Sequence, residues 1–248
     1  MRKDAWAIPV GLCLFLSAVY PLFAASPGDQ KGVEKTEKGE TAEIKPVADE
    51  ALWKEFQAIR ALQSDYETRL KAAQEAIQKD RERALSTIAF YIGQETTRQD
   101  AIRFVRVYFK DSRLVPFVVD AIRRSVGFTL LEGVKTARAL GDRRFLPVLI
   151  ENALDSDFDS ETMHPAPVGA AYHYESVFGE AAAAIYTLTK RWAGSDQYLK
   201  GPLVAKEKRT ELTVQWRKWW AENKAKWEAG APIEEKPKQA DKPPEPPA

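Results

Sequence analysis

The stretch "DRRFLPVLI", Asp142 to Ile150, decides the fold because its pattern occurs a second time. The earlier copy is "DSRLVPFVV", Asp111 to Val119. Asp, Arg and Pro occupy the same three places in both stretches, and the last three positions of both are apolar. The sequence therefore predicts one structural unit that is used at least twice.

Each copy reads as a tight turn that leads into a helix. Asp111 and Asp142 are expected to follow a helix end and to cap the next helix. Pro116 and Pro147 fall in the first turn of that helix, where the missing N–H does least harm. The apolar run after each proline then faces the core. The predicted unit is a helix, a turn and a second helix.

A single helical hairpin cannot bury its own apolar face, but stacked copies can, as in a solenoid. A further first helix is expected in "GEAAAAIYTLTKRW", which begins at Gly179, after an insertion at residues 155–172. No run alternates apolar and polar residues for long enough to predict a strand. The expected fold class is all-α, with the repeat domain at residues 94–229.

Two helices are expected to flank the repeats. Residues 49–93 carry one apolar stripe at a spacing of three or four, which predicts a long amphipathic helix that ends at Gly93. Near the C-terminus, four tryptophans share one arc of a helix and are expected to cover the last repeat. A sugar-stacking platform and an interfacial membrane helix are the alternatives. These tryptophans are Trp216, Trp219, Trp220 and Trp227.

The two ends of the chain differ in composition from the predicted helical part. Residues 1–25 have a basic start, an apolar centre and a small-residue end, which predicts a secretory signal peptide. If this segment stays uncleaved, it becomes an N-terminal membrane anchor. The only cysteine, Cys13, lies inside it, so the exported chain is expected to have no disulfide. Residues 26–48 read as a disordered linker, and residues 230–248 as a disordered Pro-rich tail.

One repeat resembles a known family. "ARALGDRRFLPVLIENALDSD", Ala137 to Asp157, is similar to a bacterial HEAT-like repeat, and "DSRLVPFVVDAIRR" is a more divergent copy. The resemblance covers about residues 95–192. It implies an armadillo-type α-solenoid that binds proteins and carries out no reaction. An iron-binding branch of that family uses His-Glu pairs, and no His-Glu dipeptide occurs here.

Charge marks the insertion as the candidate contact site. Without residues 1–25 the chain has 35 basic and 35 acidic residues, which argues against a nucleic-acid partner. Residues 145–180, in contrast, contain seven acids and no Lys or Arg. Acids next to aromatic residues are typical of interfaces. The predicted partner-binding residues are Asp157, Asp159, Glu161, Tyr172, His173 and Tyr174. The alternative is that the acids neutralise the basic helices of residues 98–144.

No catalytic motif is present, so we expect no enzyme activity and no cofactor. The predicted function is a scaffold or binding module on the periplasmic or extracellular side of the cell envelope, with another envelope protein as partner. One alternative is an enzyme or metal-binding protein that uses the insertion, with Asp155, Asp157, Asp159 and Glu161 as ligands. Another is a structural coiled-coil partner built on the stripe of residues 50–92.

Overall fold

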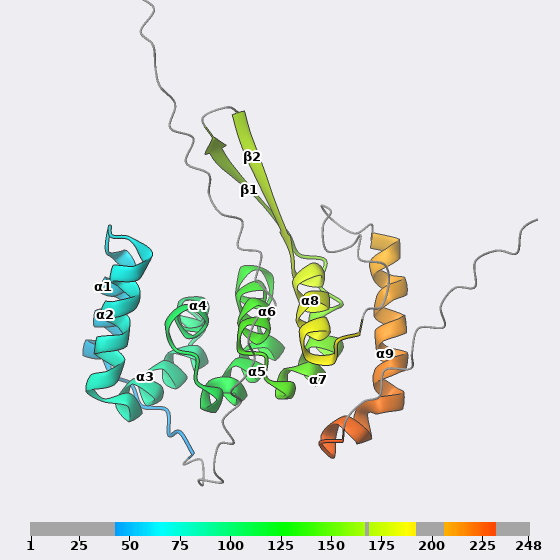
Figure 1. The fold of residues 1–248 in the computed structure, drawn as a ribbon, viewed down its shortest axis with the longest axis horizontal. Helices are drawn as coiled ribbons and strands as arrows, with labels where there is room; N and C mark the ends of the chain where they lie inside the picture. The colour runs from blue at the N-terminus through cyan, green and yellow to red at the C-terminus, as the bar shows by residue number, and fades with distance from the viewer. Residues whose placement is uncertain (1–42, 167–168, 192–205, 232–248) are drawn as a thin grey trace, which may run out of the picture. The chain divides into compact units, whose positions relative to one another are not determined.

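The computed structural model describes residues 43–166, 169–191 and 206–231, and most of these residues are helical (Figure 1). The predicted predominance of helix is therefore confirmed for the described part of the chain. The expected signal peptide, most of the linker and most of the Pro-rich tail lie outside the described residues. The longer helices are α1 (Glu50–Ala61), α2 (Tyr66–Lys79), α3 (Arg81–Gly93), α4 (Arg98–Tyr108), α5 (Val115–Arg124), α6 (Gly127–Leu140), α8 (Val177–Thr189) and α9 (Lys206–Glu228).

The prediction of one long helix over residues 49–93 is wrong, because this segment forms α1, α2 and α3. Two aspartates start the new helices. Asp65 accepts hydrogen bonds from the backbone N–H and the hydroxyl of Thr68, and Asp80 accepts one from the backbone N–H of Arg83. The apolar stripe continues across both breaks, which is why periodicity alone suggested one helix. Leu62, at the first break, is 42% exposed.

The spacing between Asp111 and Asp142 extends to two earlier aspartates, which the sequence analysis had not included. Asp49, Asp80, Asp111 and Asp142 are equally spaced along the chain, and each is the N-cap of a helix. Asp111 and Asp142 start short 3-10 turns, η1 (Ser112–Leu114) and η2 (Arg143–Phe145), which lead into α5 and α7 (Leu146–Val148). Pro116 and Pro147 lie in the first turn of those helices. A π-helical turn, η3 (Leu149–Ala153), completes the fourth capped helix.

The helices that follow the four aspartates contact one another in chain order. α1 contacts α3, α3 contacts α5, and α5 contacts α7 and η3. The second helix of each copy forms a parallel series, in which α2 contacts α4, α4 contacts α6, and α6 contacts α8 (Figure 1). Within each copy the two helices also touch. One continuous core runs from Leu52 in α1 to Trp220 in α9.

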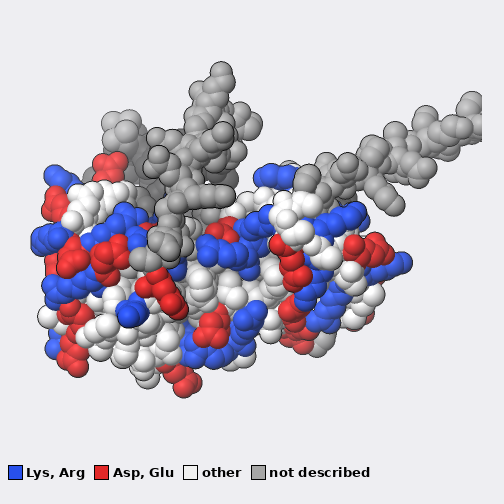
Figure 2. All heavy atoms as spheres, turned by 90° about the horizontal axis from the view of Figure 1, so that it is seen from below, with Lys and Arg blue, Asp and Glu red and all other residues white. Residues whose placement is uncertain are grey.

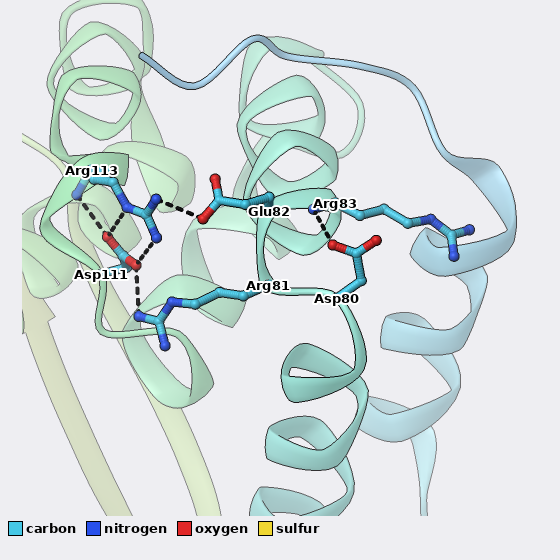
Figure 3. A network of polar contacts seen from close by, with 6 residues as sticks. All are labelled: Asp80, Arg81, Glu82, Arg83, Asp111 and Arg113. Atoms are coloured by element: carbon cyan, nitrogen blue, oxygen red, sulfur yellow. Dashed lines mark hydrogen bonds and ion pairs between the residues drawn. The ribbon is translucent and has the colours of Figure 1, made fainter. Parts of the chain in front are cut away.

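Ion pairs and hydrogen bonds join each capped helix to its neighbour in the series. Asp111 binds two arginines (Figure 3): Arg113 of its own copy donates from Nε and Nη2 at 3.2 and 3.1 Å, and Arg81 of the preceding copy donates at 2.7 Å. Arg113 also donates to Glu82 at 2.8 Å. The side chain of Asp111 is only 6% exposed. The first junction is linked in the opposite sense, because Arg83 of the second copy donates to Asp49 of the first.

The fourth copy repeats the contact between the cap aspartate and the arginine two residues after it. Arg144 donates to Asp142 through its backbone N–H, Nε and Nη2, at 2.8 to 2.9 Å. Its Nη2 also donates to the carbonyl oxygen of Ser112 at 2.7 Å, which joins the fourth copy to the third. Burial opposes ionisation of Asp142, but the bonds from Arg144 outweigh it and hold the pKa of this carboxyl below its ordinary value. The same balance lowers the pKa of Asp111.

Gly133 of α6 packs against Ile122 of α5, and this contact yields a stability prediction. A Cβ at Gly133 would lie 2.8 Å from Cγ1 of Ile122, a side chain that is 1% exposed and has no room to move. Gly133→Ala should therefore lower the free energy of unfolding by about 1–2 kcal/mol, because overpacking outweighs the gain in helix propensity. Gly93→Ala is the control, since a Cβ there meets nothing within 4 Å. Equal stability of both variants in urea unfolding would contradict this packing.

The insertion is the exception to the helical fold. Residues 159–176, where no strand was predicted, form an antiparallel hairpin of β1 (Asp159–Ala166) and β2 (Gly169–Ser176) (Figure 1). Pro165 cannot continue a helix, and the tyrosines of β2 favour strands. The insertion also extends beyond its predicted end at Tyr172, because Ser176 is the N-cap of α8.

Candidate functional site: the β-hairpin and its root

The hairpin lies between η3 and α8, where the first three copies have only short turns. Its register pairs Asp159 with Ser176 at the root and Ala166 with Gly169 near the tip. Figure 1 shows both strands projecting away from the helices. We use the term hairpin root for the side chains at positions 155–160 and 175–180 and for the residues that contact them.

The predicted contact residues are distributed along this hairpin. In the register, Glu161 pairs with Tyr174, Tyr172 with Met163, and His173 with Thr162. The side chains of residues 161–174 lie outside the described part of the structure. Their role as contact residues therefore stays a prediction.

Helix α6 holds the root on one side. Lys135 forms an ion pair with Glu175 at 2.6 Å, and the side chain of Lys135 is 15% exposed. The ring of Phe158 packs edge-on against Phe128, with 4.9 Å between the centroids. The carbonyl oxygen of Phe158 accepts a hydrogen bond from the backbone N–H of Val177 at 3.1 Å, which joins the start of the insertion to the start of α8.

Helix α9 holds the root on the other side. Arg209 forms an ion pair with Asp159 at 2.8 Å, and its side chain is 10% exposed. Arg217 pairs with Asp155. The hydroxyl of Thr213 donates to the carbonyl oxygen of Leu154 at 3.2 Å, within a buried contact. The root is thus fixed between two helices that are far apart in the sequence.

These pairs change the interpretation of the acidic insertion. Asp155, Asp159 and Glu175 are each neutralised by a basic residue of α6 or α9, and Asp157 lines a small pocket of about 130 Å³ beside Arg209. Asp155, Asp159 and Glu175 therefore act as internal counter-charges, the role that the sequence analysis had left as the alternative. The basic partners come equally from α9 and from α6, which lies within residues 98–144, because Arg138 of α6 also pairs with Glu180 at 3.2 Å.

The metal-binding alternative finds little support at the root. Among the residues that the structure describes, no group of three or more His, Cys, Asp or Glu side chains is placed to hold a metal ion. Two of the proposed ligands, Asp155 and Asp159, are occupied by arginines, and a guanidinium next to a carboxylate repels a cation. The side chain of Glu161 is outside the described part.

The tryptophan face of α9 is buried. Trp216, Trp219 and Trp220 are 1%, 6% and 5% exposed, and Trp227 is partly buried. The indole N–H of Trp220 donates to Glu151 at 3.3 Å, and that of Trp227 donates to the carbonyl oxygen of Arg143 at 3.1 Å. A sugar platform or an interfacial helix needs exposed rings, so this face packs against the fourth copy instead.

The apolar stripe of residues 50–92 is also used inside the chain. Leu52, Phe56, Ala73 and Ile77 are buried in the common core. The coiled-coil alternative requires this stripe for a second chain, and the buried part of it is already covered.

Sequence reasoning missed Lys135, Arg209 and Arg217, which hold the root. Their partners are distant in the sequence, as the pairs Lys135–Glu175 and Arg217–Asp155 illustrate. The available signal was the charge pattern. Without residues 1–25 the chain has equal numbers of acidic and basic residues, so an acidic block without bases leaves an excess of bases elsewhere that can pair with it.

Comparison with protein-family models, with curated proteins and with solved structures found no match. Within the described ranges, no helix has both the length and the apolar character that are needed to cross a membrane.

Proposed function

We propose that this chain is an exported α-solenoid of HEAT-like repeats that acts as a non-catalytic interaction scaffold in the cell envelope. Four capped helices at a constant spacing support the repeat assignment, as do the two series of helix contacts. The signal-peptide pattern of residues 1–25 supports export. The partner that we propose is another envelope protein.

The observation that carries this proposal is the position of the hairpin. It replaces a short turn in the fourth copy only, and its root is fixed by α6 and α9. A functional loop on a rigid scaffold has this arrangement, because the scaffold determines where the loop points while leaving its tip accessible.

The strands of the hairpin supply a means of binding. The described residues form a two-stranded sheet, so the outer edges of β1 and β2 carry no strand partner there. An isolated two-stranded hairpin is marginally stable, and an open edge accepts an extended segment of another protein. Pro165 has no N–H and weakens the edge of β1, whereas β2 contains no proline. We therefore propose that β2 is the edge that meets the partner.

The charge distribution is consistent with a protein partner. Lys and Arg are interspersed with Asp and Glu over the described part of the face in Figure 2. A nucleic-acid partner would require a basic surface along which phosphates are neutralised.

Shortening the hairpin tests the function. Residues 161–174 are replaced by a short Gly-Ser link. This variant keeps Asp159 and Glu175, and therefore both ion pairs that hold the root on α9 and α6. The expected result is a nearly unchanged melting temperature together with loss of the envelope protein that the intact chain captures in a pull-down.

A matched variant, Glu175→Gln, removes the ion pair with Lys135 and keeps the strands. It should lower the melting temperature by a few degrees, less so in high salt because the pair is screened, and it should retain capture. Capture that survives removal of residues 161–174 would show that the hairpin is not the contact element.

A further inference from the structure

The turn between α5 and α6 exposes two apolar side chains next to the hairpin root. Val126 is 83% exposed and Phe128 is 55% exposed. Gly127, between them, has a left-handed backbone with a φ of 61°, which glycine adopts without steric cost. The ring of Phe128 packs edge-on against Phe158 of the root. We use the term apolar turn for residues 126–128.

The apolar turn breaks the capping pattern of the second helices. Val126 is the N-cap of α6, and its side chain makes no cap hydrogen bond. In contrast, Asp65 caps α2 and Ser176 caps α8 through side-chain oxygens, and Thr97 of α4 is at least polar. Apolar residues are the least favourable ones at an N-cap. A side chain that lowers helix stability and is also exposed to solvent points to a role in function.

A basic side chain accompanies the apolar turn. Residues 121–131 contain two arginines and no acid. Arg124 pairs with Asp120 inside α5, whereas Arg123 is exposed and forms no ion pair with any residue that the structure describes. An apolar surface beside an available guanidinium fits a segment that carries an apolar side chain next to an Asp or Glu.

The charges disfavour two other occupants. A two-fold contact between the apolar turns of two copies would bring the Arg123 side chains of both copies together, and like charges repel. A bilayer that also reached the two earlier turns between first and second helices would meet exposed acids there. These acids are Asp65, Glu67 and Glu95, and they oppose an anionic membrane surface.

We propose that the apolar turn is a second contact site for the protein partner and receives a segment with an apolar side chain beside an Asp or Glu. The inference rests on the proposed function, because it assigns the turn to the same partner that meets the hairpin. The contact between Phe128 and Phe158 makes the two sites adjacent.

Val126→Asp separates binding from folding. The backbone of Val126 is extended, with φ −134° and ψ 167°, so an aspartate there can accept hydrogen bonds from the first turn of α6. The variant should therefore melt about 2–4 °C higher than the wild type. It should also capture the envelope protein at least about tenfold less well, the effect of losing an anchor residue from an interface. Leu62→Asp, at a position that is 42% exposed after α1, is the matched control and should retain capture.

Photo-cross-linking identifies what the apolar turn contacts. The photoreactive amino acid p-benzoyl-phenylalanine replaces Phe128 in the full chain, which is irradiated in its own cell envelope. The cross-linked peptide should belong to the protein that the intact chain captures, with an Asp or Glu next to the cross-linked apolar residue. Cross-links to lipid alone, or only to a second copy of this chain, would overturn the proposal.

The second contact and the proposed function can fail separately. Capture that Val126→Asp retains but the shortened hairpin loses would overturn the second contact alone. Capture that the shortened hairpin retains but Val126→Asp loses would overturn the role of the hairpin and support the apolar turn as a contact site.

Discussion

Trp216→Ala is expected to lower the free energy of unfolding by about 3–5 kcal/mol, the range for truncating a large side chain in a core. Trp216 is the largest of the fully buried side chains, at 1% exposure, and its ring meets that of Trp219 edge-on with 5.5 Å between the centroids. Its removal leaves a cavity between α9 and the fourth copy. Urea unfolding followed by circular dichroism measures the loss.

Val214→Ala is the matched control, since Val214 lies on the same helix and is 62% exposed. It should change the stability by less than about 0.5 kcal/mol. If Trp216→Ala changed the free energy of unfolding as little as Val214→Ala, α9 would not be packed on the fourth copy. The ion pairs of Arg209 and Arg217 could then not hold the hairpin root.

Asp111→Ala is expected to cost about 2–3 kcal/mol, because two guanidiniums lose the buried carboxylate that they share. Arg81 and Arg113 both donate to Asp111, and the backbone N–H of Arg113 loses its cap. Asp120→Ala is the matched control. Asp120 is 54% exposed and pairs with Arg124 one helical turn away, so its removal should cost less than about 0.5 kcal/mol.

The effect of Asp111→Ala should depend on pH in a defined direction. The pKa of Asp111 in the folded protein lies below its ordinary value of 3.8, so the folded state favours the ionised carboxylate. This stabilisation is complete above about pH 5 and is lost as the pH falls through 3.8 toward the lower folded pKa. The difference between wild type and variant should therefore shrink at pH 3. A difference that stays constant from pH 7 to pH 3 would contradict an ionic origin.

The copies that begin at Asp111 and Asp142 could be recognised as repeats from the sequence, whereas those that begin at Asp49 and Asp80 could not. The copies at Asp111 and Asp142 share Asp, Arg and Pro, and this combination leaves a visible signature. The copies at Asp49 and Asp80 keep only the aspartate, and Lys54 and Leu85 stand where the proline would be. One common residue at a fixed period does not stand out, and an apolar stripe that continued past the caps suggested a single helix.

The hairpin illustrates a different limit. Its position as an insertion was predictable, because it interrupts the repeat and carries a block of acids. Its strands were not, since a short segment with two prolines and two tyrosines has no clear period. The pairing of Asp159 with Arg209 joins residues 50 positions apart, and only the packing of α9 brings them together. Such contacts follow from tertiary structure and not from local pattern.

A double-mutant cycle on Arg81 and Asp111 tests most directly the claim that Asp111 couples the second and third copies. These two residues belong to adjacent capped helices, and Arg81 Nη2 lies 2.7 Å from Asp111 Oδ2. The cycle of Arg124 and Asp120, a pair within one helix, is the reference. The account predicts a coupling energy of at least about 1 kcal/mol for the first pair and about 0.3–0.5 kcal/mol for the second. A first coupling no larger than the second would contradict it.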